Sequence, residues 1–150
     1  MGGFQRSRIR SAFDAAFRRM CEADDIAALE EELSNVLNHL YRMGEHCKKR
    51  LGKPTYLSAL QTSPDLRAAR AAIWARTFDV HEAVVTASSE DLYSQFYTNF
   101  YGVLAWKPLA SLPRQTDKHG RHVDYQQELE GRPVLDSMHR AFSALERLLP

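Results

Sequence analysis

The chain has 150 residues, enough for one domain that buries about 70% of its unfolded surface in a single core. With 44% hydrophobic and 26% charged residues, its composition is that of an ordinary globular protein. The formal net charge of +1 indicates no class of partner, and the apolar runs are too short to cross a bilayer. Cys21 and Cys47 lack metal-ligand spacing, and the first residues lack the apolar core of a signal peptide. We therefore expect a cytoplasmic protein with reduced thiols.

Charge is unevenly distributed at the start of the chain. Residues 1–20 contain five arginines against one aspartate, whereas residues 21–32 contain six acids and no base. Two interpretations remain open. The two segments attract each other or a second copy of the chain, or the first segment is an arm that binds nucleic acid. On the second interpretation, the candidate phosphate-binding residues are Arg6, Arg8 and Arg10.

Three helices are predicted in the first part of the chain: over 4–20, from Asp24 or Asp25 to Leu51, and over 63–88. In the first, apolar residues recur at steps of three and four. An aspartate can cap the second, and a Gly-Lys-Pro sequence ends it. A Ser-Pro-Asp sequence begins the third, which is apolar on most of its circumference, so we expect it to be central in the domain.

The second part of the chain is less regular. Five aromatic residues lie between Tyr93 and Tyr101, in a segment for which helix is favoured and strand is the alternative. Over 107–133, prolines and glycines predict a long irregular connection. A last helix follows from Val134, with an apolar stripe at helical spacing. The predicted fold is all-α, a bundle of four or five helices in one domain (1–150) with a long connection.

One helix carries a motif with a known chemical use. The third predicted helix contains Arg76-Thr77-Phe78-Asp79-Val80-His81. An arginine, four residues and a histidine in this order resemble the signature of the HEPN superfamily, small helical-bundle proteins of prokaryotic defence and toxin–antitoxin systems. The resemblance covers these six residues, the chain size and the helix content. Two other arginine–histidine pairs have an allowed spacing, but neither lies inside a strongly predicted helix.

The resemblance implies metal-independent cleavage of RNA by a homodimer. Arg76 would bind phosphate, because a guanidinium is always charged and donates two parallel hydrogen bonds. His81 would transfer a proton, because imidazole titrates near neutral pH. The two side chains lie about 140° apart around the helix axis, so a second copy would complete the site. The structural alternative is that Arg76 pairs with an acid on a neighbouring helix and His81 is a core or rim histidine.

Other candidate residues lie in the irregular connection and on the second helix. Lys118 and Arg121 belong to a basic stretch that could contact phosphate. Two groups of histidines lack the further ligands of a metal site, so we predict no metal or cofactor; they are His39, His46 and His81 on helices, and His119 and His122 in the connection.

Two functions therefore remain as hypotheses. The first is an HEPN-like homodimer that cleaves RNA without metal, and it requires Arg76 and His81 to converge on an accessible cleft. The alternative is a non-catalytic helical adaptor, subunit or inhibitor that binds a nucleic-acid-processing protein complex. The adaptor hypothesis predicts that both residues are buried and paired and that an aromatic patch is exposed elsewhere. Neither hypothesis involves a membrane.

Overall fold

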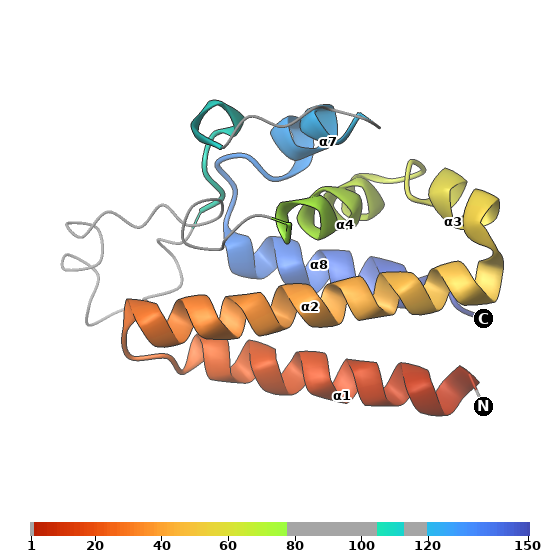
Figure 1. Ribbon diagram of the computed structural model, residues 1–150, viewed down its shortest axis with the longest axis horizontal. Helices are drawn as coiled ribbons and strands as arrows, with labels where there is room; N and C mark the ends of the chain where they lie inside the picture. Colours follow the sequence, from red (N-terminus) through yellow and green to blue (C-terminus); the bar gives the residue numbers. More distant parts are fainter. Residues whose placement is uncertain (1, 78–104, 113–119) are drawn as a thin grey trace.

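The computed structural model describes residues 2–77, 105–112 and 120–150 (Figure 1). These residues form α-helices and a 3-10 turn, η2 (Leu109–Ser111), with no strand beyond two isolated bridges. The helices are α1 (Gly2–Cys21), α2 (Ile26–Leu51), α3 (Lys53–Ala59), α4 (Pro64–Ala75), α7 (Arg121–Glu128) and α8 (Val134–Arg147). The prediction of an all-α fold is confirmed.

The first two helices form an antiparallel hairpin, along the bottom of Figure 1. The expected stripe of α1 is buried, including Ile9, Phe13 and Met20. Asp25 caps α2, and its side chain accepts a hydrogen bond of 2.7 Å from the backbone N–H of Ala28. The predicted boundaries of both helices are confirmed to within two residues.

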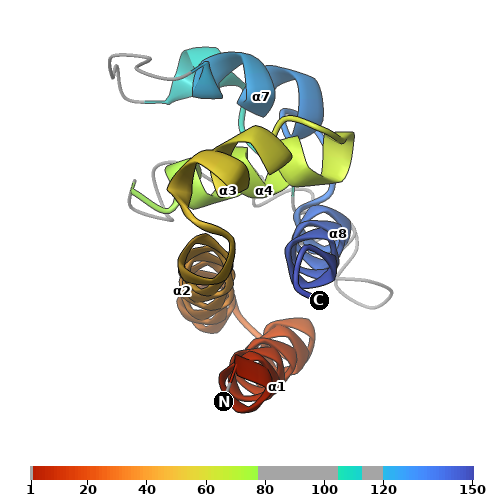
Figure 2. The same ribbon diagram turned by 90° about the vertical axis from the view of Figure 1, so that its right-hand side faces the viewer.

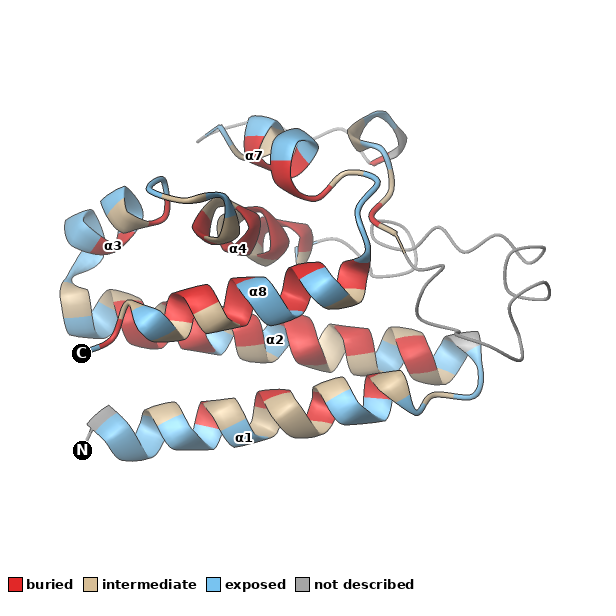
Figure 3. Ribbon diagram, turned by 180° about the vertical axis from the view of Figure 1, so that it is seen from behind, coloured by how far each residue is buried: buried red, intermediate tan, exposed pale blue. Residues whose placement is uncertain are grey.

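The helices are stacked in layers (Figure 2). α1 lies below the pair formed by α2 and α8, α3 and α4 lie above this pair, and α7 covers α4. Phe13 of α1 and Phe142 of α8 stack with their ring centroids 3.9 Å apart, which joins the bottom layer to α8 as well as to α2. Buried residues face the spaces between the layers (Figure 3). The chain ends lie at the same end of the bundle (Figure 1).

α4 is central, as its composition predicts, but it is shorter than expected. It contacts α2, α7 and α8, and most of its residues are buried. It begins at the predicted Ser63 cap but ends at Ala75, so the prediction of one continuous helix over 63–88 is wrong. The reason lies in Thr77, whose backbone N–H (3.0 Å) and hydroxyl (2.7 Å) both donate to the carbonyl of Trp74. This tight turn closes the end of α4.

The connection over 107–133 also contains more structure than predicted, because α7 lies within it. α7 has only two apolar residues, so its sequence has no apolar stripe to reveal a helix. Ring contacts and ion pairs both hold it on α4. Trp74 of α4 packs against His122 and Tyr125, with ring centroids 5.1 and 5.8 Å apart. Asp124 lies 3.5 Å from Arg70, and Glu128 lies 3.5 Å from Arg67. The hydroxyl of the buried Tyr125 donates to the carbonyl of Lys107 at 2.7 Å.

α3 is a further helix that the sequence did not predict, since Gly52-Lys53-Pro54 was interpreted only as the end of α2. The last helix is confirmed as α8. The aromatic segment 93–101 and residues 78–88 lie outside the described residues. None of the described helices combines the length and apolarity needed to span a membrane.

Candidate functional site

A cleft of about 480 Å³ lies between α2, α3 and α4, and Arg121 of α7 also lines it. Its lining is strongly basic, with five cationic side chains against one carboxylate. These charged residues are Lys48, Lys53, Arg70, Arg76, Arg121 and Glu45. A cleft with such a surplus of positive charge attracts anions, because its walls concentrate the field.

The cations of this basic cleft differ in how far they are neutralised. Lys48 forms an ion pair of 2.8 Å with Glu45, one helical turn away on α2. Arg70 is paired with the buried Asp124 of α7. By contrast, neither Lys53 nor Arg76 has a carboxylate partner among the described residues. These two side chains are therefore available to form an ion pair with an anionic ligand.

Arg76 is held in place by groups that leave its charge uncompensated. It follows the last residue of α4 and is half-buried. Its guanidinium carbon lies 3.9 Å from the ring centroid of Tyr41, and its Nη1 donates to the side-chain oxygen of Asn38 at 3.4 Å. Its Nε is buried without a hydrogen-bond partner in the described structure. The guanidinium is thus oriented by an aromatic face and a neutral amide, an arrangement suited to binding a phosphate oxygen.

The floor of the cleft depends on a close helix contact. Tyr56 of α3 and Ile73 of α4 line the cleft and approach Gly44 of α2. A Cβ atom on Gly44 would lie only 2.6 Å from the hydroxyl oxygen of Tyr56, so glycine is needed for this approach. Burial raises the pKa of Tyr56 far above its usual value, so its hydroxyl stays neutral and serves packing rather than proton transfer.

The structure separates the predicted phosphate-binding residues into two groups. Arg121, from the irregular connection, lines the same cleft as Arg76, although the two are far apart in sequence. Lys118 and His81 lie outside the described residues. The expected pairing of Arg76 with an acid is not observed among the described residues, where it contacts Asn38 and Tyr41.

The arginines of α1 lie away from the cleft, in the layer on the other side of α2 and α8 (Figure 2). Arg6 and Arg10 both reach Glu146 of α8, at 3.9 and 3.4 Å, and Arg8 lies over the ring of Phe4. Arg19 forms an ion pair of 3.1 Å with Glu32 of α2. The Arg19–Glu32 pair agrees with the interpretation in which the opposite charges of the first two helices attract each other, whereas Arg6 and Arg10 pair with α8.

Sequence reasoning missed the contribution of the α2–α3 junction to the cleft. Lys48 and Lys53 lie in a run with Lys49 and Arg50, at the place where the sequence indicated only the end of a helix. The density of four bases in six residues was the available signal. Tyr41, one turn of α2 from Asn38, was not singled out either, because its partner Arg76 comes from a different helix.

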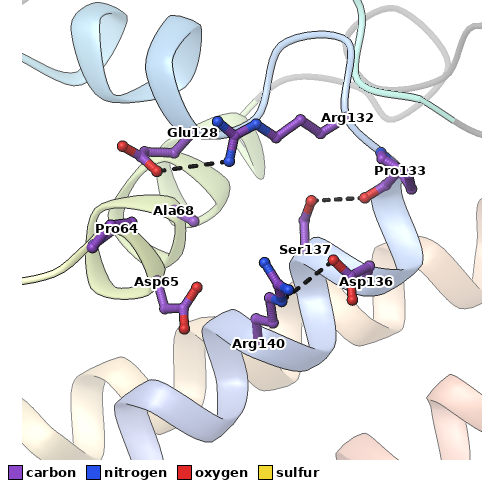
Figure 4. A pocket seen from close by; sticks show the side chains of 9 residues that line it. All are labelled: Pro64, Asp65, Ala68, Glu128, Arg132, Pro133, Asp136, Ser137 and Arg140. Carbon is purple, nitrogen blue, oxygen red and sulfur yellow. Dashed lines mark hydrogen bonds and ion pairs between the residues drawn. The ribbon is translucent and has the colours of Figure 1, made fainter.

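A smaller pocket of about 70 Å³ lies between the starts of α4 and α8 (Figure 4). Its arginines are paired within the pocket, Arg132 with Glu128 at 3.9 Å and Arg140 with Asp136 at 3.4 Å. The hydroxyl of Ser137 donates to the carbonyl of Pro133. Since these groups satisfy one another, the pocket offers a ligand less than the basic cleft does.

The candidate histidines of α2 do not form a metal site with other described residues. His46 is buried, whereas His39 is partly exposed and lies 3.2 Å from Nη1 of Arg42 through its Nδ1. Burial, followed by the charges of Arg42 and Arg19, lowers the pKa of His39. Within the described ranges, no group of three or more potential ligands comes together.

Comparisons with known proteins do not identify the chain. No protein-family model, curated protein or solved structure matches it. A functional assignment therefore depends on the residues of the basic cleft and on their chemistry.

Proposed function

We propose that the protein binds RNA in the basic cleft and cleaves it without a metal ion, as an HEPN-like protein of a defence or toxin–antitoxin type system. The proposal rests on the contacts and the charge of Arg76. Its guanidinium is oriented by Tyr41 and Asn38, lines a cleft rich in cations, and has no carboxylate partner among the described residues. In the motif that begins at this residue the arginine would bind phosphate, and an arginine oriented in this way is suited to that role.

In the proposed reaction, the 2′-hydroxyl oxygen attacks the adjacent phosphorus, and the bond from phosphorus to the 5′-oxygen breaks. One imidazole, that of His81, accepts the proton of the 2′-hydroxyl or supplies the proton of the departing 5′-oxygen. Arg76 stabilises the negative charge that develops on the phosphorane oxygens. The products are a 2′,3′-cyclic phosphate and a 5′-hydroxyl, so neither water nor a cofactor is consumed in this step.

A second copy of the chain is part of the proposal. In the family that the motif resembles, two protomers pair and form one shared cleft. A homodimer brings a second Arg76 and a second His81 to a shared site. Light scattering of the purified protein should therefore give a mass of twice 17.2 kDa.

Cleavage of unstructured RNA in EDTA tests the enzyme. Arg76→Ala and His81→Ala should each lower the cleavage rate by about 100-fold or more. Arg76→Lys should retain only part of the activity, because an ammonium keeps the charge but loses the two parallel hydrogen bonds. Arg140→Ala is the matched control, since it removes an exposed arginine outside the cleft and should leave the rate unchanged.

Thermal unfolding of the same variants separates catalysis from folding. Both activity-deficient variants should melt within a few degrees of the wild type. Wild-type protein that leaves varied RNAs intact would contradict the proposed cleavage. In that case the non-catalytic adaptor is the remaining hypothesis, and capture of a nucleic-acid-processing complex would be the measurement to make.

A further inference from the structure

The basic cleft has an apolar side that phosphate binding does not need. Leu57, Leu60 and Ile73 line it together with the cations. Leu57 is 39% exposed, one of three large hydrophobic side chains exposed in the described structure, and it is the one that lies in the cleft. Exposed apolar surface beside positive charge is the combination that binds a base and its phosphate together.

The shape of the cleft limits which nucleic acid can use both sides. At about 480 Å³ and lined by residues of four helices, it falls in the size range of small-molecule sites. A double helix keeps its base faces stacked inside and offers a cleft only phosphates, sugars and base edges. An unpaired nucleotide can turn its base outward against an apolar or guanidinium surface.

We propose that the basic cleft takes one unpaired nucleotide of a single strand, with its base against Leu57 and Ile73 and the strand's phosphates on either side of that base at Lys53 and at Arg76. The inference rests on the proposed function for the choice of RNA as ligand, but it concerns binding and not cleavage. Arg76 takes part in both binding and cleavage. One face of its guanidinium lies on Tyr41, and its N–H groups remain able to reach a phosphate oxygen.

Binding is measured with a fluorescent 2′-O-methyl oligoribonucleotide, which lacks the attacking hydroxyl and so cannot be cleaved by the proposed reaction. The same strand annealed to its complement is the duplex probe, and a nucleoside monophosphate is the competitor. The single strand should bind at least tenfold more tightly than the duplex. The monophosphate should compete only at concentrations far above that of the strand, because neighbouring phosphates of a strand add electrostatic affinity.

Two exposed positions test the two halves of the site without disturbing the core. Leu57→Asn should weaken single-strand binding about tenfold and leave its salt dependence unchanged. Lys53→Ala should weaken binding and lower the slope of log affinity against log salt by about one. Val123→Asn and Lys49→Ala are the matched controls, since both residues are exposed and neither lines the cleft.

The outcomes separate this inference from the proposed function. Duplex binding as tight as single-strand binding, a monophosphate that competes as well as the strand, or Leu57→Asn with unchanged affinity would each overturn the inference. Single-strand binding that depends on Leu57 and Lys53, without cleavage of the unmodified strand, would uphold the inference and refute the nuclease. Cleavage by a Leu57→Asn, Lys53→Ala double variant with wild-type affinity would uphold the nuclease and refute the inference.

Discussion

Replacement of Gly44 by alanine tests the close helix contact beneath the cleft. Alanine is favoured over glycine inside a helix by about 1 kcal/mol. Against this gain, the new Cβ would lie 2.6 Å from the hydroxyl oxygen of Tyr56, whereas ordinary contact begins at 3.4 Å. Opening this gap in a packed core costs about 1–3 kcal/mol. Gly44→Ala should therefore lower the free energy of unfolding by roughly 0–2 kcal/mol.

The same substitution in a Tyr56→Phe background should behave differently. Without the hydroxyl, the nearest atoms to the new Cβ are Cδ1 of Ile73 at 3.1 Å and Cζ of residue 56 at 3.7 Å. The end of an isoleucine side chain can shift by a few tenths of an ångström, so most of the helix-propensity gain should appear. The two substitutions should consequently show a coupling energy of about 1–3 kcal/mol.

Urea unfolding of the wild type, the two single variants and the double variant measures this coupling directly. In thermal unfolding, each kcal/mol corresponds to a shift of about 2–4 °C for a chain of this size. The reasoning is refuted if Gly44→Ala costs the same free energy in both backgrounds, because the Tyr56 hydroxyl would then not be the obstacle. Stabilisation of the wild type by Gly44→Ala would refute it equally.

Three further results are expected. Phe142→Ala should lower the free energy of unfolding by about 3–5 kcal/mol, because the ring is fully buried against Phe13; a urea-unfolding loss below about 1 kcal/mol would contradict this. Asp124→Ala should cost about 3 kcal/mol by leaving the partly buried Arg70 without its ion-pair partner, and adding Arg70→Met should recover most of that loss, whereas an additive double variant would argue against the pair. Burial lowers the pKa of His39 in the folded state, so the unfolded chain binds that proton more readily. As the pH drops below about 6.5, the stability of the wild type should therefore fall more than that of His39→Gln. Unfolding curves of both proteins at pH 7.5 and 5.5 measure this difference, and equal losses of stability would contradict it.

The parts of the fold that sequence reasoning predicted are those fixed by local signals. α1, α2 and α8 each present an apolar stripe, and capping residues such as Asp25 and Ser63 mark helix starts through hydrogen bonds within three residues. The end of α4 was missed because Thr77 is compatible with a helix by composition, and only its hydroxyl geometry shows that it closes a turn. α7 was missed because it has no apolar stripe: ring contacts with Trp74 and long-range ion pairs hold it on α4.

The candidate site was predicted only in part for a similar reason. Arg76 and Arg121 were singled out separately, and nothing in their sequence separation indicates that they line one cleft. Lys53 was assigned to a helix end, because α3, the helix that places it at the cleft, was not predicted. Convergence of charge from four helices is a property of packing, and a single sequence contains no periodicity that encodes it.

The three arginines in α4 and directly after it show how packing decides which charge is available to a ligand. Arg67 and Arg76 are nine residues apart, so they lie on opposite sides of the helix at 100° per residue. α7 covers the side of Arg67 and Arg70 and neutralises them with Glu128 and Asp124. Arg76 instead faces α2, which meets it with an aromatic ring and an amide but with no carboxylate among the described residues. The charges of the sequence alone make the three arginines equivalent, and it is α7, the helix without a sequence signal, that sets Arg76 apart from the other two.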